Sequence, residues 1–283
     1  MGIPFVKTLS LLLTILLPVL LPAKAGVEKV FAKDNLVAWC IVPFDAKKRG
    51  PAERVDMAKR LGFTKIAYDW RGEHVPSFEQ EILEYKKRDI EFFAFWSWHD
   101  SFEPLIKKYG IKPQVWKTLG SPADETQEAK VNAAAGSMLP LLKKCELLGL
   151  KLGLYNHGGW GGEPANLVAV CQALHKQGHK NVGIVYNFHH GHGHVDDFSE
   201  SLTLMKPYLL CLNLNGMAKK SQKFQKILPI GKGQNEASMM KTILKVGYEG
   251  PIGILGHVAS RDVETVLKEN LKGLYELTGK LDQ

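Results

Sequence analysis

The sequence predicts an α/β protein, a single (β/α)8 barrel that follows an N-terminal signal peptide. Eight short apolar segments alternate with helical patterns to form eight strand–helix units. Such alternation is typical of parallel strands joined by right-handed crossovers. Residues 26–283 have the length of a barrel of this kind, which is typically about 250 residues. No Gly-x-Gly-x-x-Gly motif follows the first apolar segment, which disfavours an open dinucleotide-binding sheet.

The first half of the barrel contains four predicted strands. Each is a run of mostly apolar residues, as expected for strands that are buried on both faces. The runs span residues 36–42, 63–68, 90–96 and 113–118. Apolar residues with helical spacing follow the first two runs, at 51–61 and 77–88, and Gly62 is a typical helix stop. The third run leads into a less regular segment that ends near Tyr109 and Gly110.

The second half of the barrel contains four more strands and the longer helices. The strands are expected at residues 151–155, 182–186, 209–213 and 252–255. The helices are expected at residues 127–148, 163–177, 197–205, 236–246 and 262–277. Pro140 is expected to disturb the first of these helices, because proline has no N–H to donate. No linker or low-complexity stretch divides the chain, so we expect one domain at residues 26–283.

The N-terminus has the pattern of a signal peptide. Lys7 precedes an apolar run at residues 9–21, and residues 23–25 (Ala-Lys-Ala) have the small-x-small pattern of a cleavage site. The run is short and contains proline, which disfavours a permanent transmembrane helix, and no other segment could span a membrane. We therefore expect residues 1–25 to be cleaved, or retained as an anchor, and the barrel to be secreted or periplasmic.

Composition and charge exclude some function classes. The formal net charge is +8, but the basic residues are scattered over helical patterns without interleaved aromatic residues, which disfavours a nucleic-acid partner. The four cysteines lie in apolar patterns without C-x-x-C spacing, which predicts small core residues. Because export permits disulfides, a Cys145–Cys171 bridge stays open as the alternative. The sequence predicts no particular oligomeric state.

Polar residues at the ends of the predicted strands are the candidates for function, because the active site of a (β/α)8 barrel lies at the C-terminal ends of its strands. Seven of the ten histidines stand at such positions. The main candidates are Asp45, Asp69, Trp98, Lys117, Asn156, His157, Asn187, His189, His190, His192, His194, Asn213 and His257. Imidazoles at the end of a buried strand are typical of proton transfer or of metal binding.

The densest group of histidines lies at residues 189–194. His190, His192 and His194 alternate with glycines, so an extended backbone would place the three rings on one side. Three imidazoles suit a divalent transition metal such as Zn²⁺ or Mn²⁺. They equally suit a site without a metal.

Tryptophans and glycines add to the candidate site. All six tryptophans lie near strand ends. Trp98 and Trp160 are candidates to stack on the C–H face of a sugar ring, while Asp69 and the strand-end asparagines bind its hydroxyls. The segment 231–233 (Gly-Lys-Gly) precedes a predicted helix and could bind an anion at the N-terminus of that helix.

Four segments carry a resemblance to a known family. They are residues 156–159 (Asn-His-Gly-Gly), 187–190 (Asn-Phe-His-His), 229–233 (Pro-Ile-Gly-Lys-Gly) and 247–253 (Gly-Tyr-Glu-Gly-Pro-Ile-Gly). In these segments the chain resembles the xylose isomerase-like TIM-barrel superfamily, which contains sugar isomerases, epimerases and endonuclease-IV-like proteins. The resemblance covers nearly all of the barrel. Residues 155–162 resemble a secreted branch that is often labelled sugar phosphate isomerase/epimerase.

The resemblance also implies a metal site, from which this chain departs. The family typically holds a divalent metal with Glu, Asp, His and Glu after strands five to eight. Carried over by position, these ligands become Tyr155, Asn187, Asn213 and Leu255 or Gly256. The family's carboxylate ligands are therefore replaced, and the resemblance implies a remodelled site.

The leading hypothesis is an exported enzyme that acts on a small carbohydrate by proton transfer beside a carbonyl or hydroxyl, as in isomerisation, epimerisation or elimination. His157, His190 or His257 would act as general acid or base, with a second histidine or Lys117 as the partner. Neutral imidazoles and the positive net charge of the chain would stabilise an oxyanion that forms on the substrate during the reaction.

Three asparagines complete this hypothesis, and two other functions compete with it. Asn156, Asn187 and Asn213 would hydrogen-bond hydroxyls or an enediolate oxygen. The alternative is a non-catalytic sugar-binding barrel that has lost the metal carboxylates. A DNA-repair function is disfavoured, because that chemistry needs a multi-metal site rich in carboxylates.

Overall fold

The structure is a computed structural model that describes residues 1–2, 26–218 and 226–281. The predicted signal peptide falls on residues 1–25, of which residues 3–25 lie outside the described part. Within the described ranges, no helix is long and apolar enough to cross a membrane.

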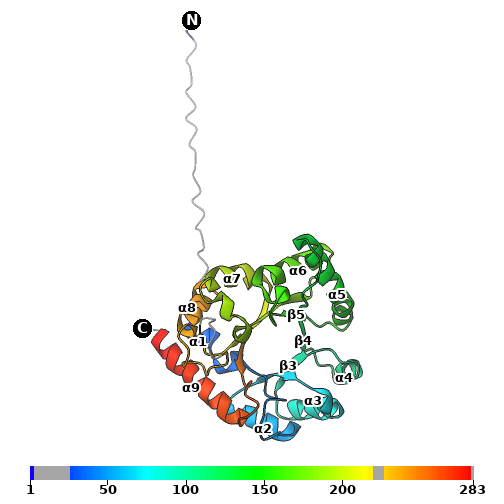
Figure 1. Cartoon of the computed structure of the whole chain (residues 1–283), viewed down its shortest axis with the longest axis vertical. Coiled ribbons are helices and arrows are strands. Elements are labelled where there is room, and N and C mark those ends of the chain that lie inside the picture. The colour runs from blue at the N-terminus through cyan, green and yellow to red at the C-terminus, as the bar shows by residue number, and fades with distance from the viewer. Residues whose placement is uncertain (3–25, 219–225, 282–283) are drawn as a thin grey trace.

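Eight parallel strands close into a barrel in the order in which they occur along the chain (Figure 1). They are β1 (Leu36–Trp39), β2 (Lys65–Asp69), β3 (Glu91–Trp96), β4 (Gln114–Thr118), β5 (Leu152–Tyr155), β6 (Val182–Asn187), β7 (Leu209–Leu214) and β8 (Ile252–Leu255). β1 pairs with both β2 and β8, so the ring has no free edge. The predicted single (β/α)8 TIM barrel is confirmed.

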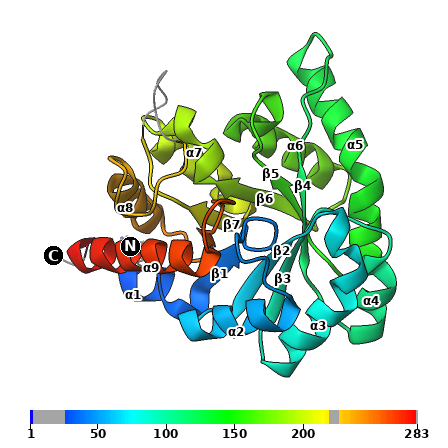
Figure 2. The same ribbon diagram turned by 60° about the horizontal axis from the view of Figure 1, so that its bottom comes forward.

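Helices form an outer layer around the strands, and α9 packs beside α2 (Figure 2). The helices are α1 (Val27–Val30), α2 (Pro51–Leu61), α3 (Phe78–Lys87), α4 (Phe102–Tyr109), α5 (Gln127–Leu147), α6 (Pro164–Lys176), α7 (Phe198–Met205), α8 (Glu236–Val246) and α9 (Val263–Leu281). Gly62 ends α2 at φ +88°, a left-handed conformation in which a side chain would be strained.

Two local predictions need correction. Helix α4 occupies the segment that we expected to be irregular, because Phe102 and Ile106 are four residues apart and bury the same face. Its end is set by Gly110 at φ +61°. Helix α5 runs through Pro140 without a break, and Pro140 lies on the exposed face of that helix.

The core has two layers, which follow from the alternation of side chains along each strand. Side chains such as Val37, Trp116 and Val185 fill the barrel interior, whereas their neighbours along each strand pack under the helices. The four cysteines are buried and free. They are therefore small core residues as predicted, and the alternative Cys145–Cys171 bridge is not formed.

Candidate active site

A small cavity of about 60 Å³, here called the mouth cavity, opens at the C-terminal ends of the strands. Its polar lining consists of Cys40, Asp69, Arg71, His157, His190 and His257. Its aromatic walls are Trp39, Phe44, Trp96 and Tyr155. These side chains come from β1, β2, β3 and β5 and from the loops that follow β1, β2, β5, β6 and β8. The cavity therefore has the position expected of a barrel active site.

Asp69, the last residue of β2, is the acidic group of the mouth cavity. It is 1 % exposed, and its Oδ1 accepts a hydrogen bond from the Val42 N–H at 3.2 Å. Its Oδ2 has no hydrogen-bond partner among the described residues. Burial raises the pKa of Asp69 to about 7, although the Arg71 charge and the Val42 N–H oppose this rise. At neutral pH this carboxyl can therefore both accept and donate a proton.

Cys40 and Arg71 flank Asp69. Cys40 has φ +56°, a left-handed conformation that is unfavourable for a residue with a Cβ and is found often at functional sites. Burial and the neighbouring Asp69 raise the pKa of the Cys40 thiol, so it stays neutral. The Arg71 guanidinium donates to the Trp70 carbonyl at 2.7 Å and lies 5.5 Å from the centre of the Phe44 ring.

A hydrogen-bond network orients the hydroxyl of Tyr155. The Asn187 side-chain oxygen accepts from the His189 N–H at 3.1 Å, so its Nδ2 faces Tyr155 and donates to that hydroxyl at 2.6 Å. Asn156 exchanges two hydrogen bonds with the Asn187 backbone. Burial raises the pKa of Tyr155, so the phenol stays neutral and keeps a proton for an acceptor in the cavity.

Four imidazoles form a row beside this network. Ring centroids are 4.5 Å apart for His157 and His190, 4.3 Å for His190 and His189, and 5.2 Å for His189 and His257. Burial is the largest cause that lowers the pKa of His189 to about 3, of His190 to about 2 and of His257 to about 4. These three rings are therefore neutral at pH 7, where each can donate one N–H.

The structure does not bring His190, His192 and His194 together. The backbone forms two short 3-10 turns, at Phe188–His190 and His192–His194, rather than the extended path that would align the rings. The ring nitrogens of His192 face the Ala218 and Lys226 carbonyls at 2.7 and 2.8 Å. His194 contacts carboxylates of Asp197 and Glu163 instead.

The remaining side chains do not fit the metal that the family resemblance implies. At the strand-five and strand-six positions, Tyr155 is a neutral phenol and Asn187 turns its N–H rather than its oxygen toward it. Asn213 is fully buried against Gly253. In the part of the chain that the structure describes, no three His, Cys, Asp or Glu side chains are placed to hold a metal ion. Hard cations require oxygen ligands that this set does not supply.

Three other predicted residues lie outside the mouth cavity lining. Trp98 donates to Asp100 at 2.9 Å, and Trp160 donates to Gln127 at 2.9 Å. Lys117 alternates with the interior Trp116, so its side chain lies on the outer face of β4. We did not predict Tyr155, Trp39 and Trp96 as binding residues. The period-2 pattern groups Tyr155 and Trp39 with interior positions of their strands, whereas β3 is irregular before Trp96, with the consecutive Phe93 and Ala94 both inside.

The Gly-Lys-Gly segment at 231–233 does not offer a free anion site. The carboxylate of Glu236, which is 3 % exposed, accepts from the N–H groups of Met217, Gly231 and Gly233 at 2.7 to 3.0 Å. The backbone donors that we expected to bind a ligand are therefore already occupied by a side chain of the chain itself.

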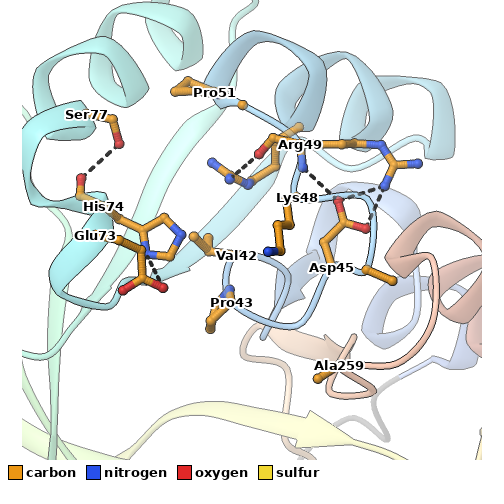
Figure 3. A pocket seen from close by; sticks show the side chains of 13 residues that line it. Val42, Pro43, Asp45, Lys48, Arg49, Pro51, Glu73, His74, Ser77 and Ala259 are labelled. Atoms are coloured by element: carbon orange, nitrogen blue, oxygen red, sulfur yellow. Dashed lines mark hydrogen bonds and ion pairs between the residues drawn. The ribbon is translucent and has the colours of Figure 1, made fainter.

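A second cavity of about 560 Å³, here called the rim cavity, is lined mainly by the β1–α2 loop and by the segment that follows β2 (Figure 3). Asp45 forms a two-oxygen contact with Arg49 at 2.8 and 2.9 Å. Arg54 donates to the Arg49 carbonyl and forms an ion pair with the buried Glu81. These charged groups are paired with one another. The rim cavity is larger than the mouth cavity, but it therefore has no buried carboxyl comparable to Asp69, whose second oxygen lacks a partner among the described residues.

A family model described as xylose isomerase-like TIM barrel matches residues 104–277. The chain belongs to this family. No curated protein matches its sequence significantly. Among solved structures, it is similar to 3-keto-D-glucoside 4-epimerase from E. coli, with 13 % identity and a TM-score of 0.65 over 86 % of this chain and 100 % of the other.

Two further similar structures contain metals. The zinc-bound IOLI protein is 14 % identical, with a TM-score of 0.68 over 87 % of this chain and 98 % of the other. A magnesium complex of a xylose isomerase-like TIM-barrel protein from Mycobacterium smegmatis is 16 % identical, with a TM-score of 0.58 over 87 % and 97 %. At such identities the likeness establishes the shared fold alone.

Proposed function

We propose that this protein is an exported carbohydrate isomerase, epimerase or lyase that moves a proton at a carbon next to a carbonyl. Family membership and the sugar epimerases among the similar structures support a small-molecule carbohydrate substrate. The observation that carries the proposal is Asp69, a buried carboxyl with an unpartnered oxygen in the mouth cavity. The basis for export is the N-terminal sequence pattern alone.

In the proposed reaction Asp69 is the base. Its carboxylate removes a proton from the carbon beside the carbonyl, and the electron pair of the broken C–H bond forms an enediolate. The pKa of about 7 suits this task, because the carboxylate is available near neutrality and the protonated form can return the proton. Return of the proton to the former carbonyl carbon gives isomerisation. Protonation of the original carbon on its opposite face, with water as the proton source, gives epimerisation. Loss of a β-substituent gives elimination.

The enediolate oxygen needs hydrogen-bond donors that do not ionise themselves. Tyr155 supplies a phenolic O–H held by Asn187, and the neutral rings of His190 and His257 each supply an N–H. Such preorganised donors stabilise charge that develops in the transition state. The histidines predicted to act as bases are thus better suited to hydrogen bonding, because their lowered pKa makes them weak proton acceptors.

Solvent-deuterium incorporation tests the proposal. The purified protein, in D2O with a panel of aldoses, ketoses and oxidised sugars, is expected to introduce deuterium next to the carbonyl. Asp69→Asn keeps the acceptor for the Val42 N–H but should slow exchange by roughly 10²- to 10⁴-fold. Tyr155→Phe should slow it by about 10²-fold.

Asp197→Asn is the matched control, since Asp197 is an exposed acid outside the mouth cavity that pairs with His194. It should exchange at the wild-type rate. Saturable sugar binding without exchange by the wild-type protein would favour the non-catalytic sugar-binding barrel instead. Equal exchange by wild-type protein and Asp69→Asn would remove Asp69 from the reaction.

A further inference from the structure

The mouth cavity shares wall residues with two larger cavities, here called side cavities. One, of about 300 Å³, shares His157 and His190 with the mouth cavity, and the other, of about 380 Å³, shares His257. Lys226 lines both side cavities. Lys226 is thus separated from the mouth cavity only by the shared histidine side chains.

Two positively charged side chains around these cavities lack a carboxylate partner among the described residues. Arg71 donates only to the backbone carbonyls of Asp69 and Trp70, and it forms no ion pair with a carboxylate of the described residues. Lys226, within the same described set, also forms no ion pair, and its side chain is exposed. Glu163 lines only the side cavity that shares His157 and His190, where it contacts His194 at 2.9 Å. On the His257 side, Arg71 and Lys226 therefore have no carboxylate partner within the described ranges, and Asp69 is the only acid in the lining of the mouth cavity and the adjoining side cavity.

His257 is the residue that the Arg71-lined mouth cavity shares with the Lys226-lined side cavity. Its ring centroid is 3.6 Å from that of Phe44, whose ring also lies under the Arg71 guanidinium. Both Arg71 and Lys226 contribute to lowering the pKa of His257. Positive potential therefore converges where the neutral His257 ring can donate an N–H, which is a favourable place for an anionic group of a ligand.

We propose, on the basis of the proposed function, that the substrate is a sugar acid whose carboxylate binds between Arg71 and Lys226 at His257. The aromatic walls Trp39, Trp96 and Phe44 suit the C–H face of its ring. A carboxylate is favoured over a phosphate, because the backbone N–H groups at Gly231 and Gly233 that could have cradled a phosphate are closed by Glu236.

Three matched sugar series test the inference: hexuronates, neutral hexoses and hexose 6-phosphates of gluco, galacto and manno configuration. Deuterium exchange is measured with the full chain at pH 8, where Asp69 is ionised. We expect kcat/KM for a hexuronate to exceed that for the matched hexose by at least about tenfold. Rising salt should reduce this preference, because exposed charges are screened.

Variants that remove one positive charge test which residues cause the preference for hexuronates. Lys226→Gln should raise KM for the hexuronate about tenfold and leave kcat within about threefold. Arg71→Gln should raise that KM by a similar factor and move the pH profile of exchange to higher pH, because the Arg71 charge opposes the raised pKa of Asp69. Lys226→Gln should leave KM for a neutral hexose unchanged. Lys241→Gln, which removes the same charge from the exposed face of α8, is the control and should behave as wild type.

Each outcome separates this inference from the proposed function. Equal exchange into hexuronates and hexoses would overturn the sugar-acid assignment and leave proton transfer standing. A preference for hexose 6-phosphates would also overturn it. Calorimetric binding of a hexuronate that is lost in Arg71→Gln, without any exchange, would support the anion site and refute the proposed chemistry. If the protein neither binds a hexuronate nor exchanges deuterium into any of the sugars, both the inference and the proposed function are refuted.

Discussion

Asp45 lies in the loop after β1 and Asp69 ends the neighbouring strand β2, and both carboxyls are buried, at 5 % and 1 % exposure. Asp45 contacts the Arg49 guanidinium with both oxygens and accepts from the N–H groups of Lys47, Arg49 and Val263. Asp69 accepts from the Val42 N–H, and its other oxygen has no partner among the described residues. Both acids thus lie at the same end of the barrel near the ends of neighbouring strands. They differ in the number of hydrogen-bond and ion-pair partners that the protein supplies to their oxygens.

The comparison shows how one residue type serves two purposes in one barrel. Asp45 joins the β1–α2 loop to the start of α9 through Val263, and its charge is compensated where it stands. Asp69 carries a charge that the fold compensates poorly, which costs stability and makes a proton available near neutral pH. Substitutions at the two positions should therefore have opposite effects on stability.

The largest expected effect on stability is that of Asp45→Asn. Removing one partner of a buried ion pair leaves Arg49 partly uncompensated, which typically costs about 3 kcal/mol or more. Asp262 and Glu264 also contact Arg49, so we expect about 3 kcal/mol and a fall in Tm of roughly 10 °C. Chemical and thermal denaturation measure this change.

Asp56→Asn is the control for that experiment, because Asp56 forms an exposed ion pair with Arg88 and should contribute less than about 1 kcal/mol. Deuterium exchange per folded molecule should be unchanged in Asp45→Asn. Equal, small losses of stability in both variants would contradict the view that Asp45 is structural.

Asp69→Asn should instead stabilise the protein at alkaline pH. The pKa of Asp69 is raised in the folded state to about 7 from 3.8, so the stability that it contributes is present at low pH and is lost as pH rises through 7. The loss is on the order of 4 kcal/mol between pH 4 and pH 8. Asparagine does not ionise and so avoids this loss of stability. Its buried amide costs about 1–3 kcal/mol, so the net gain in the free energy of unfolding at pH 8 is about 2 kcal/mol.

Urea unfolding at pH 5 and pH 8 measures this difference. The gain should be clear at pH 8 and absent or reversed at pH 5, where the wild-type carboxyl is mostly protonated. A difference between the two proteins that does not change with pH would contradict the raised pKa of Asp69.

The same pKa predicts the pH dependence of exchange. Because the base must be ionised, kcat/KM should fall about tenfold for each pH unit below 7. The lowered pKa values of His189, His190 and His257 place their titration below this range. The profile is measured between pH 5 and pH 9 in wild-type protein and Asp45→Asn. A flat profile, or one that moves in Asp45→Asn, would assign the titration to another group.

The fold was predictable because its signals are local and repeated. Each strand is a short apolar run, and alternation of such runs with amphipathic helices leaves few arrangements other than a barrel. Helix α4 was missed because a helix of eight residues with two buried apolar positions gives a weak periodic pattern. The position of Asp69 at the mouth followed from its place at the end of a strand.

The directions of side chains were only partly predictable within strands and not predictable after them. The period-2 rule shows that neighbours such as Trp116 and Lys117 lie on opposite faces, but a run that is apolar on both faces does not show which face is the interior. His190, His192 and His194 lie beyond the end of β6, where two 3-10 turns decide where each ring points. Burial decides the pKa of Asp69, and burial depends on residues from several strands that no local pattern brings together.

The smallest expected effect concerns Lys48 in the loop that carries Asp45. Lys48 has φ +48°, a left-handed conformation that costs a residue with a Cβ about 1–2 kcal/mol. Lys48→Gly removes this cost but adds entropy to the unfolded chain, so we expect a net gain of about 0.5 kcal/mol and unchanged exchange. Lys48→Ala removes the same side chain but keeps a Cβ at the left-handed φ, so it should not gain stability. Because both changes remove the same lysine side chain, a gain in Lys48→Gly alone, measured by urea unfolding, would isolate the backbone contribution. Equal losses would mean that the loop around Asp45 is not strained at Lys48.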